Sequence, residues 1–223
     1  MGDRQLSVAV TPNGYADAVT RNSDGKWYFA EPHHEKIKGD VYYLQSQNGN
    51  LYPSSHFTSA GKEGNCELVN LRRDVPAEVP WCSEGLGRCP DAVNLWIGDS
   101  RSVTSIHSDP YENIYHVARG LKTFLLLPPT EGWCLEERLY SHAIYQRESK
   151  NSPLSLKPSP STIPPVHGAH PMIIDVKAGE TLYLPAGWWH HVRQSGLSIA
   201  LNWWYDLEPR GPASVLTTPG PRG

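Results

Sequence analysis

The sequence predicts an all-β or β-rich fold, arranged as a sandwich or a double-stranded barrel. Helical periodicity is scarce, and 20 prolines and 19 glycines interrupt the chain every few residues. Short runs of β-branched and aromatic residues lie between these interruptions, a pattern typical of strands. Several runs are separated by turns of hairpin length, which favours antiparallel neighbours over parallel strands joined by helices.

We expect strands at residues 7–10, 40–44, 92–97, 113–117, 123–127, 173–176, 181–184, 189–192 and 198–205. Hairpin-length turns containing glycine lie at 118–120, 185–187 and 194–196. A length of 223 residues fits one domain. We expect a short lead at 1–6, a folded domain over 7–208 with a Pro- and Ser-rich insertion at 148–165, and a disordered tail at 209–223.

Charge and composition exclude several classes of protein. The net charge is −3, from 20 Lys and Arg against 23 Asp and Glu. This gives no large basic field, so nucleic-acid binding is disfavoured. No run is apolar enough to predict a membrane span, and the first residues lack the apolar stretch of a secretory leader. We therefore expect a cytoplasmic location, with the nucleus as a second, and reduced thiols at the 4 cysteines.

A metal site is predicted at His107, Asp109 and His190. His107 and Asp109 are two residues apart, so in a strand both side chains point to one face. His190 comes from a distant run and would complete a set of two histidines and one carboxylate. This facial triad leaves one side of an octahedral Fe(II) open. A second His-x-Glu pattern, at 33–35, lies in a polar segment and is interpreted as solvated surface.

Lys122 indicates the cosubstrate. A buried lysine near a metal needs a carboxylate partner, and the distal carboxylate of 2-oxoglutarate would supply it. Iron(II), Asp109, 2-oxoglutarate and Lys122 would then be neutral together. Asn113 has the same parity as His107, and Asn202 lies on the strand that the 194–196 turn would pair with the strand of His190. For each of these polar residues alone, a hydrogen bond within the core is the alternative.

Three runs resemble the JmjC-domain 2-oxoglutarate oxygenases, and in particular the small JmjC-only protein hydroxylases. They are TSIHSDPYENIYHVARGLKTFLLLPP, AGETLYLPAGWWHHV and LNWWYD. Further similar stretches are VAVTPNGYADAV and VPWCSEGLGRCPDAVNLWIG, so that the resemblance extends from about residue 7 to 206. It implies a double-stranded β-helix, the jelly-roll or cupin-like JmjC fold, with peripheral helices.

The resemblance also implies a set of site residues. The iron ligands would be His107, Asp109 and His190; His191 is excluded, because the family uses the first histidine after the aromatic pair. Thr104 and Lys122 would bind the distal carboxylate of 2-oxoglutarate. The same pocket would be lined by Asn113, Asn202, Tyr43 (with Tyr42 as the alternative register) and Trp204 as an aromatic wall.

The implied activity is Fe(II)- and 2-oxoglutarate-dependent lysyl hydroxylation of GTP-binding proteins of the translation-factor class, with O₂ as the second cosubstrate. Alternatives are N-methyl arginine or lysine demethylation, a histone-tail protease activity, and a tRNA-modifying oxygenase. A further alternative is a truncated, inactive protein. Family members carry a segment before VAVTP and some carry a dimerising helical extension; we expect this chain to lack both and to be less stable for it. A homodimer is left open.

Overall fold

The computed structural model describes residues 9–11, 18–21, 27–30, 41–45, 49–58, 66, 68–135 and 169–206. The predictions for 1–6, 33–35, 148–165 and 209–223 lie outside these residues. Within them, no helix is both long and apolar enough to cross a bilayer. The 4 cysteines of the chain are free thiols.

Two long strands organise the core. They are β7 (Tyr111–Leu127) and β10 (Trp189–Asp206), which pair antiparallel along most of their length. The shorter strands beside them are β5 (Ala92–Gly98), β6 (Thr104–Ser108), β8 (Met172–Lys177) and β9 (Thr181–Leu184). The long strands therefore form a common ladder to which the short strands add at either side.

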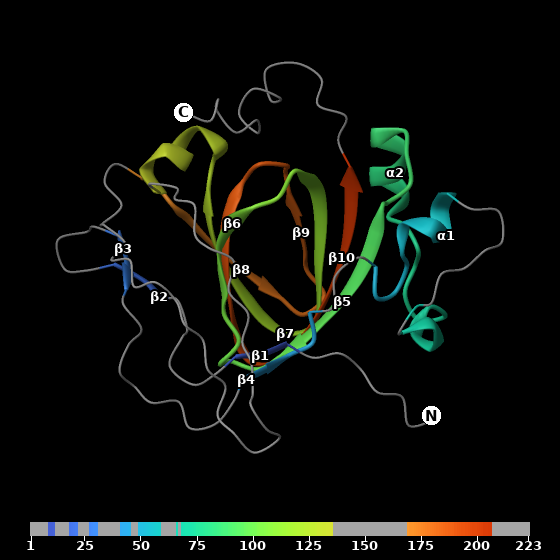
Figure 1. Cartoon of the computed structure of the whole chain (residues 1–223), viewed down its shortest axis with the longest axis horizontal. Helices are drawn as coiled ribbons and strands as arrows, with labels where there is room; N and C mark the ends of the chain where they lie inside the picture. The colour runs from blue at the N-terminus through green and yellow to red at the C-terminus, as the bar shows by residue number, and fades with distance from the viewer. Residues whose placement is uncertain are drawn as a thin grey trace, which may run out of the picture.

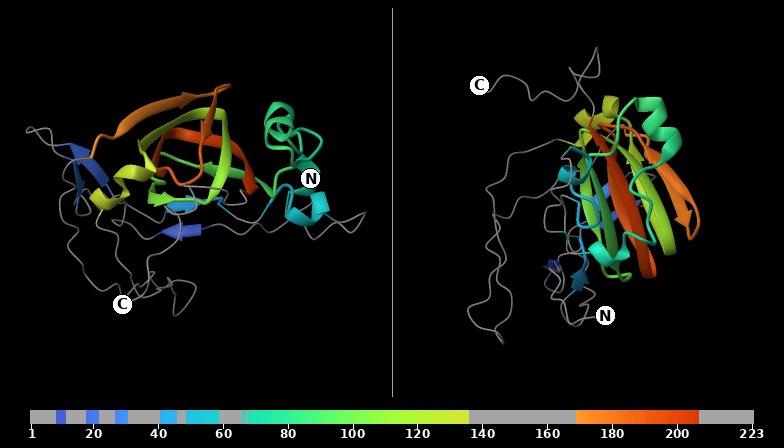
Figure 2. Two further views of the ribbon diagram at one scale, coloured as in Figure 1. Left: turned by 90° about the horizontal axis from the view of Figure 1, so that it is seen from above. Right: turned by 90° about the vertical axis from the view of Figure 1, so that its right-hand side faces the viewer.

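This ladder is bent into two facing sheets. The β5 sheet has the order β5–β10–β7–β9 and contains residues 198–206 of β10 and 111–119 of β7. The β6 sheet has the order β6–β10–β7–β8 and contains residues 189–195 of β10 and 121–127 of β7. Figures 1 and 2 show the strands curling around a common interior. The predicted double-stranded β-helix with peripheral helices is confirmed.

The glycine-containing turns have a different role from the one predicted. Residues 118–120 and 194–196 do not close hairpins, because the residues on either side of each turn lie in different sheets. The same holds for 185–187, which connects β9 of one sheet to β10 of the other. Glycine with positive φ serves a sheet corner as well as a hairpin. The predicted strands 113–117 and 123–127 are thus parts of β7, and 189–192 and 198–205 are parts of β10.

The corner at Gly120 is more crowded than the corner at Gly196. Its φ is 81°, and a Cβ atom there would lie 2.7 Å from the carbonyl oxygen of Leu197 and 2.7 Å from Oγ of Ser198. We expect Gly120→Ala to lower the free energy of unfolding by about 1–3 kcal/mol, or about 2–4 °C in Tm for each kcal/mol. Gly196→Ala is the matched control, because φ is also positive, at 66°, but no atom lies within 4 Å. Equal Tm values for the two variants would contradict the steric argument.

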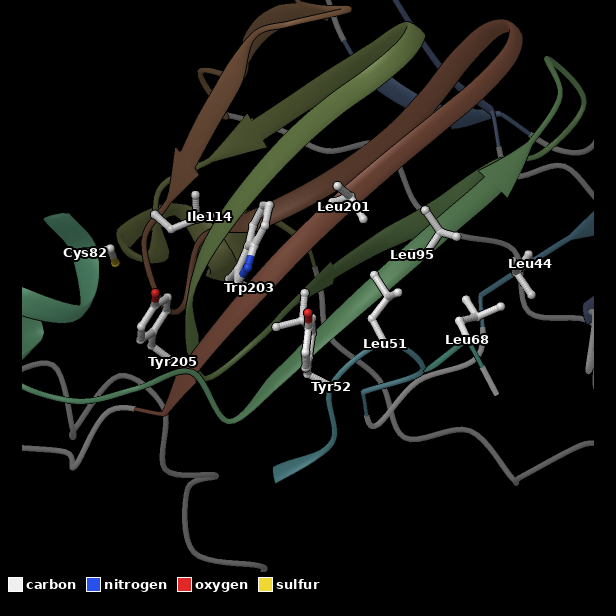
Figure 3. Close-up of a cluster of buried hydrophobic side chains, with 11 residues drawn as sticks. Leu44, Leu51, Tyr52, Leu68, Cys82, Leu95, Ile114, Leu201, Trp203 and Tyr205 are labelled. Atoms are coloured by element: carbon white, nitrogen blue, oxygen red, sulfur yellow. The ribbon is translucent and has the colours of Figure 1, made fainter. Parts of the chain in front are cut away.

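The outer face of the β5 sheet is covered by helices and loops. Figure 3 shows a cluster of buried hydrophobic side chains to which β10 contributes Leu201, Trp203 and Tyr205, with Tyr205 lying beside α2 (Pro80–Leu86). The Tyr205 hydroxyl accepts a hydrogen bond from the Val79 backbone N–H at 3.2 Å and lies 3.1 Å from Oγ of Ser83. Because strand side chains alternate, the even-numbered residues of the same strand face the interior. Packing on this outer face therefore fixes which residues of β10 reach the site.

The remaining elements lie at the edges of the core. β4 (Val41–Tyr43) pairs with β1 (Ala9–Thr11), and a bridge from Leu44 to Ile97 joins β4 to β5. β2 (Ala18–Arg21) and β3 (Trp27–Ala30) form a hairpin on the side of the barrel away from α1 (Ser54–Thr58), as Figure 1 shows. Two short 3-10 segments are Val69–Leu71 and Pro129–Leu135. The bridge from β4 brings Tyr43 to the edge of the barrel interior.

Candidate active site

His107, Asp109 and His190 come together at one end of the β6 sheet. His107 on β6 is paired in register with His190 on β10, and the two rings lie 4.1 Å apart. Oδ2 of Asp109 lies 3.5 Å from Nε2 of His107 and 3.6 Å from Nε2 of His190. Within the described residues, this is the one group of at least three His, Cys, Asp or Glu side chains with the spacing of metal ligands.

Backbone carbonyls orient both imidazoles. Nδ1 of His107 lies 2.8 Å from the carbonyl oxygen of Ser105, and Nδ1 of His190 lies 3.0 Å from that of Trp188. A carbonyl only accepts, so each Nδ1 carries the proton and donates. Each Nε2 then faces Asp109, and in the neutral imidazole it carries the lone pair. This is the arrangement in which histidine binds a metal ion.

The electrostatics of the group suit a cation. Burial lowers the pKa of His190 to about 4, so this imidazole is neutral at pH 7. Burial also lowers the pKa of His107, but the hydrogen bonds to Asp109 and Ser105 outweigh it and the pKa is raised above its usual value. For Asp109, burial raises the pKa, yet the hydrogen bond and charge of His107 bring it below normal. The group thus presents the ionised carboxylate of Asp109 beside the neutral imidazole of His190.

His191 lies outside this group, as the resemblance implies. It follows His190 directly and therefore points to the opposite face of the strand. There its Nε2 accepts a hydrogen bond from Nε of Arg193 at 3.3 Å.

A cavity opens from the three residues into the space between the sheets. Its lining residues are Tyr43, Trp96, Thr104, His107, Asp109, Asn113, Tyr115, Phe124, His190, Val192, Asn202 and Trp204. Every site residue predicted from the sequence is in this set except Lys122, which adjoins it through Tyr43. The register at β4 is that of Tyr43, since Tyr42 is 55% exposed.

Lys122 is a buried cation without a counterion among the described residues. Its side chain is 2% exposed, and Nζ donates to the Tyr43 hydroxyl at 3.2 Å. Burial alone lowers its pKa to about 7. The Tyr43 hydroxyl is also hydrogen-bonded to the side chains of Thr104 and Tyr115. A buried ammonium group beside a hydroxyl that is itself hydrogen-bonded to two others is a site for an anion, and a carboxylate fits it.

An amide network lines the opposite wall. The Trp96 indole N–H donates to Oδ1 of Asn202 at 2.8 Å, and Nδ2 of Asn202 donates to Oδ1 of Asn113 at 3.2 Å. The prediction that the strand of Asn202 pairs with the strand of His190 is wrong. Residue 202 lies in the β5 sheet, paired with Asn94 and Tyr115. Asn202 reaches the cavity from the facing sheet because β10 crosses from one sheet to the other.

Several lining residues are not predicted from the sequence. Tyr115 lies two residues after Asn113 on the same strand face, so the parity that identified Asn113 also applies to it. Trp96, Phe124 and Val192 are apolar or aromatic residues of predicted strands. They carry no signal that distinguishes a cavity wall from ordinary core. Only the pairing of the two sheets identifies them.

Comparisons with known proteins identify the family of the chain. The model of the cupin-like domain family matches residues 1–211. The human bifunctional peptidase and (3S)-lysyl hydroxylase JMJD7 is 38% identical, over 93% of this chain and 70% of that protein. Lysine-specific demethylase JMJ32 of Arabidopsis thaliana is 36% identical, over 93% and 68%. JmjC domain-containing protein E of Dictyostelium discoideum is 29% identical, over 93% and 71%. The chain therefore belongs to the cupin-like domain family and, within it, to the JmjC-domain 2-oxoglutarate-dependent oxygenases.

Proposed function

We propose that this protein is an Fe(II)- and 2-oxoglutarate-dependent hydroxylase of lysine side chains in GTP-binding proteins of the translation-factor class. His107, Asp109 and His190 hold the iron. The cosubstrate pocket is formed by Thr104, Lys122, Asn113, Asn202, Tyr43 and Trp204. The sequence resemblance supports the substrate class, and the name of the human relative, a (3S)-lysyl hydroxylase, supports the reaction.

The observation that carries the proposal is the pairing of two complementary half-sites. Two imidazole lone pairs and a carboxylate converge at one end of the cavity. Tyr43, whose hydroxyl accepts a hydrogen bond from Lys122, lines the same cavity. A keto acid with a second carboxylate bridges such half-sites, because one end chelates a metal and the other pairs with the ammonium. Iron, Asp109, 2-oxoglutarate and Lys122 are then neutral together, which offsets part of the cost of burying each charge.

The residues of the chain bind and orient, and the cofactor supplies the oxidation. Bound Fe(II) provides oxygen activation, for which no protein side chain is sufficient. Lys122, Tyr43 and Thr104 hold the distal carboxylate. The amides of Asn113 and Asn202 direct polar groups toward the cavity, while Phe124 and Val192 keep water out of it.

The test is mass spectrometry of a translation-factor-class GTP-binding protein after incubation with the chain, Fe(II) and 2-oxoglutarate. Hydroxylation adds about 16 Da to a lysine and forms succinate. An Asp109→Ala variant is the control and gives neither. Absence of both products with the parent chain, under conditions in which it binds Mn(II), would overturn the proposal.

Demethylation is the second candidate, because the Arabidopsis thaliana relative is named a lysine-specific demethylase. The same incubation with an N-methylated lysine peptide distinguishes it, since removal of one methyl group lowers the mass by about 14 Da. Fragments of the peptide would instead indicate the peptidase activity in the name of the human relative.

A further inference from the structure

Gln194 lies directly opposite Lys122 on the neighbouring strand. The two residues are register partners in the ladder of β10 and β7, and their side chains are 7% and 2% exposed. Gln194 has the parity of His190 and Val192, which both line the cavity. Paired side chains on one face of a sheet are in contact range. Gln194 is therefore a neighbour of the cosubstrate cation.

The two ends of the Gln194 carboxamide are used unequally. Nε2 donates to the carbonyl oxygen of Asp99 at 2.7 Å, which fixes the orientation of the amide. Oε1 is buried and has no hydrogen-bond partner among the described residues, and the same is true of Oγ of Ser102. A buried acceptor without a partner is costly, so each of these oxygens needs a donor.

Gly98 shows how closely these groups pack. A Cβ atom at this position would lie 2.5 Å from Nε2 of Gln194, 2.6 Å from Cδ2 of Tyr43 and 2.8 Å from Oγ of Ser102. The three side chains therefore converge on one point at the floor of the barrel. Tyr43 is also the residue whose hydroxyl accepts a hydrogen bond from Lys122.

Lys122 can supply the hydrogen-bond donor that Oε1 of Gln194 lacks. An ammonium group has three N–H donors. One goes to Tyr43, and a bound distal carboxylate takes a second. The third has no acceptor among the described side chains, while Oε1 of Gln194 has no donor.

We propose, building on the function proposed above, that Gln194 is a positioning residue for the distal carboxylate of 2-oxoglutarate. Its Oε1 accepts, directly or through one water shared with Ser102, the Lys122 N–H that the carboxylate leaves unused. Neutrality of the amide is essential to this role. A carboxylate at position 194 would pair with Lys122 and repel the anion that Lys122 binds.

The experiment compares two ligands on the Mn(II)-loaded full chain by calorimetry. N-oxalylglycine is an inert analogue with the distal carboxylate, and pyruvate is a keto acid without it. Gln194→Glu should raise the Kd for N-oxalylglycine by about tenfold or more and leave the Kd for pyruvate within about twofold of the parent value. Gln194→Met removes the acceptor without adding charge. It should raise the Kd for N-oxalylglycine by about threefold to tenfold.

Two further variants separate positioning from general damage. Ser195→Glu places the same charge on the neighbouring exposed residue and should leave both affinities unchanged. In a Lys122→Met background, Gln194→Met should cause no further loss, because Gln194 acts through the ammonium.

The proposal is overturned if Gln194→Glu and Gln194→Met bind N-oxalylglycine within about twofold of the parent. It is also overturned if the affinity for pyruvate falls in parallel, or if the losses in N-oxalylglycine affinity caused by Lys122→Met and Gln194→Met are additive. If Gln194→Glu does not fold, the Gln194→Met results decide alone. Failure of the parent chain to bind N-oxalylglycine at all would instead count against the proposed function, so the two failures are distinguishable.

Discussion

His190→Ala is expected to lower the affinity for Fe(II) or Mn(II), and with it succinate formation, by at least about 100-fold. The substitution removes the most buried of the three ligand candidates, whose Nε2 already faces Asp109. Loss of groups that only orient metal ligands costs 10- to 100-fold in other sites, so loss of a ligand itself should cost more. Metal affinity is measured by electron paramagnetic resonance of Mn(II), and turnover by succinate release.

His191→Ala is the matched control. The two histidines are adjacent and both buried, so the substitutions remove equal volumes from the same strand. They differ in the face to which the ring points. His191→Ala should therefore keep the metal affinity even where it lowers Tm. If His191→Ala loses the metal and His190→Ala retains it, the ligand assignment is wrong.

Lys122→Met is expected to raise the Kd and KM for 2-oxoglutarate by about tenfold or more. Methionine fills the volume of the lysine stem but offers the carboxylate neither charge nor donor. Lys122→Arg is a poor control, because the guanidinium is larger and its donors are fixed in a fork. Tyr43→Phe is a second variant of the same pocket, because it removes only the hydroxyl that Lys122 contacts and keeps the ammonium. An unchanged KM in Lys122→Met would exclude Lys122 as the anchor of the distal carboxylate.

In the ligand-free protein, the same substitution should change how the free energy of unfolding depends on pH. Burial lowers the pKa of Lys122 from 10.5 to about 7, so between these values the unfolded chain binds more protons than the folded chain. The free energy of unfolding therefore rises with pH across this range. Lys122→Met removes that rise, and a bound dicarboxylate suppresses it by pairing the ammonium. Urea unfolding at a series of pH values, with and without N-oxalylglycine, measures both effects; a rise that persists in Lys122→Met would have another origin.

The sequence predicts the residues of the site better than the way in which they meet. Parity along a strand places His107 with Asp109, and the spacing of aromatic residues before His190 supports its register. Asn202 was expected in the cavity for the wrong reason, because a glycine turn has the same local sequence whether it closes a hairpin or bends a strand into the next sheet. Local sequence encodes the turn, but pairing of strands far apart in the chain decides between the two.

The strand β6 is a second element that local sequence alone does not predict. It was not among the strands predicted from composition, since its residues include two serines and a histidine. These polar residues satisfy a functional requirement and weaken the apolar signal of the strand. The H-x-D spacing nevertheless predicted an extended segment there, so the chemistry of the site was the better guide.

The sharing of β7 and β10 by both sheets has a consequence for how the protein folds. Each of these strands carries residues from both walls of the cavity, and their partners are distant in the chain. No half of the barrel can form the site alone, and closing such long loops makes the ladder slow to nucleate. Assembly of the cavity should therefore coincide with the rate-limiting step of folding. Once the barrel is closed, the central amides of both strands should exchange with solvent only when the whole domain unfolds.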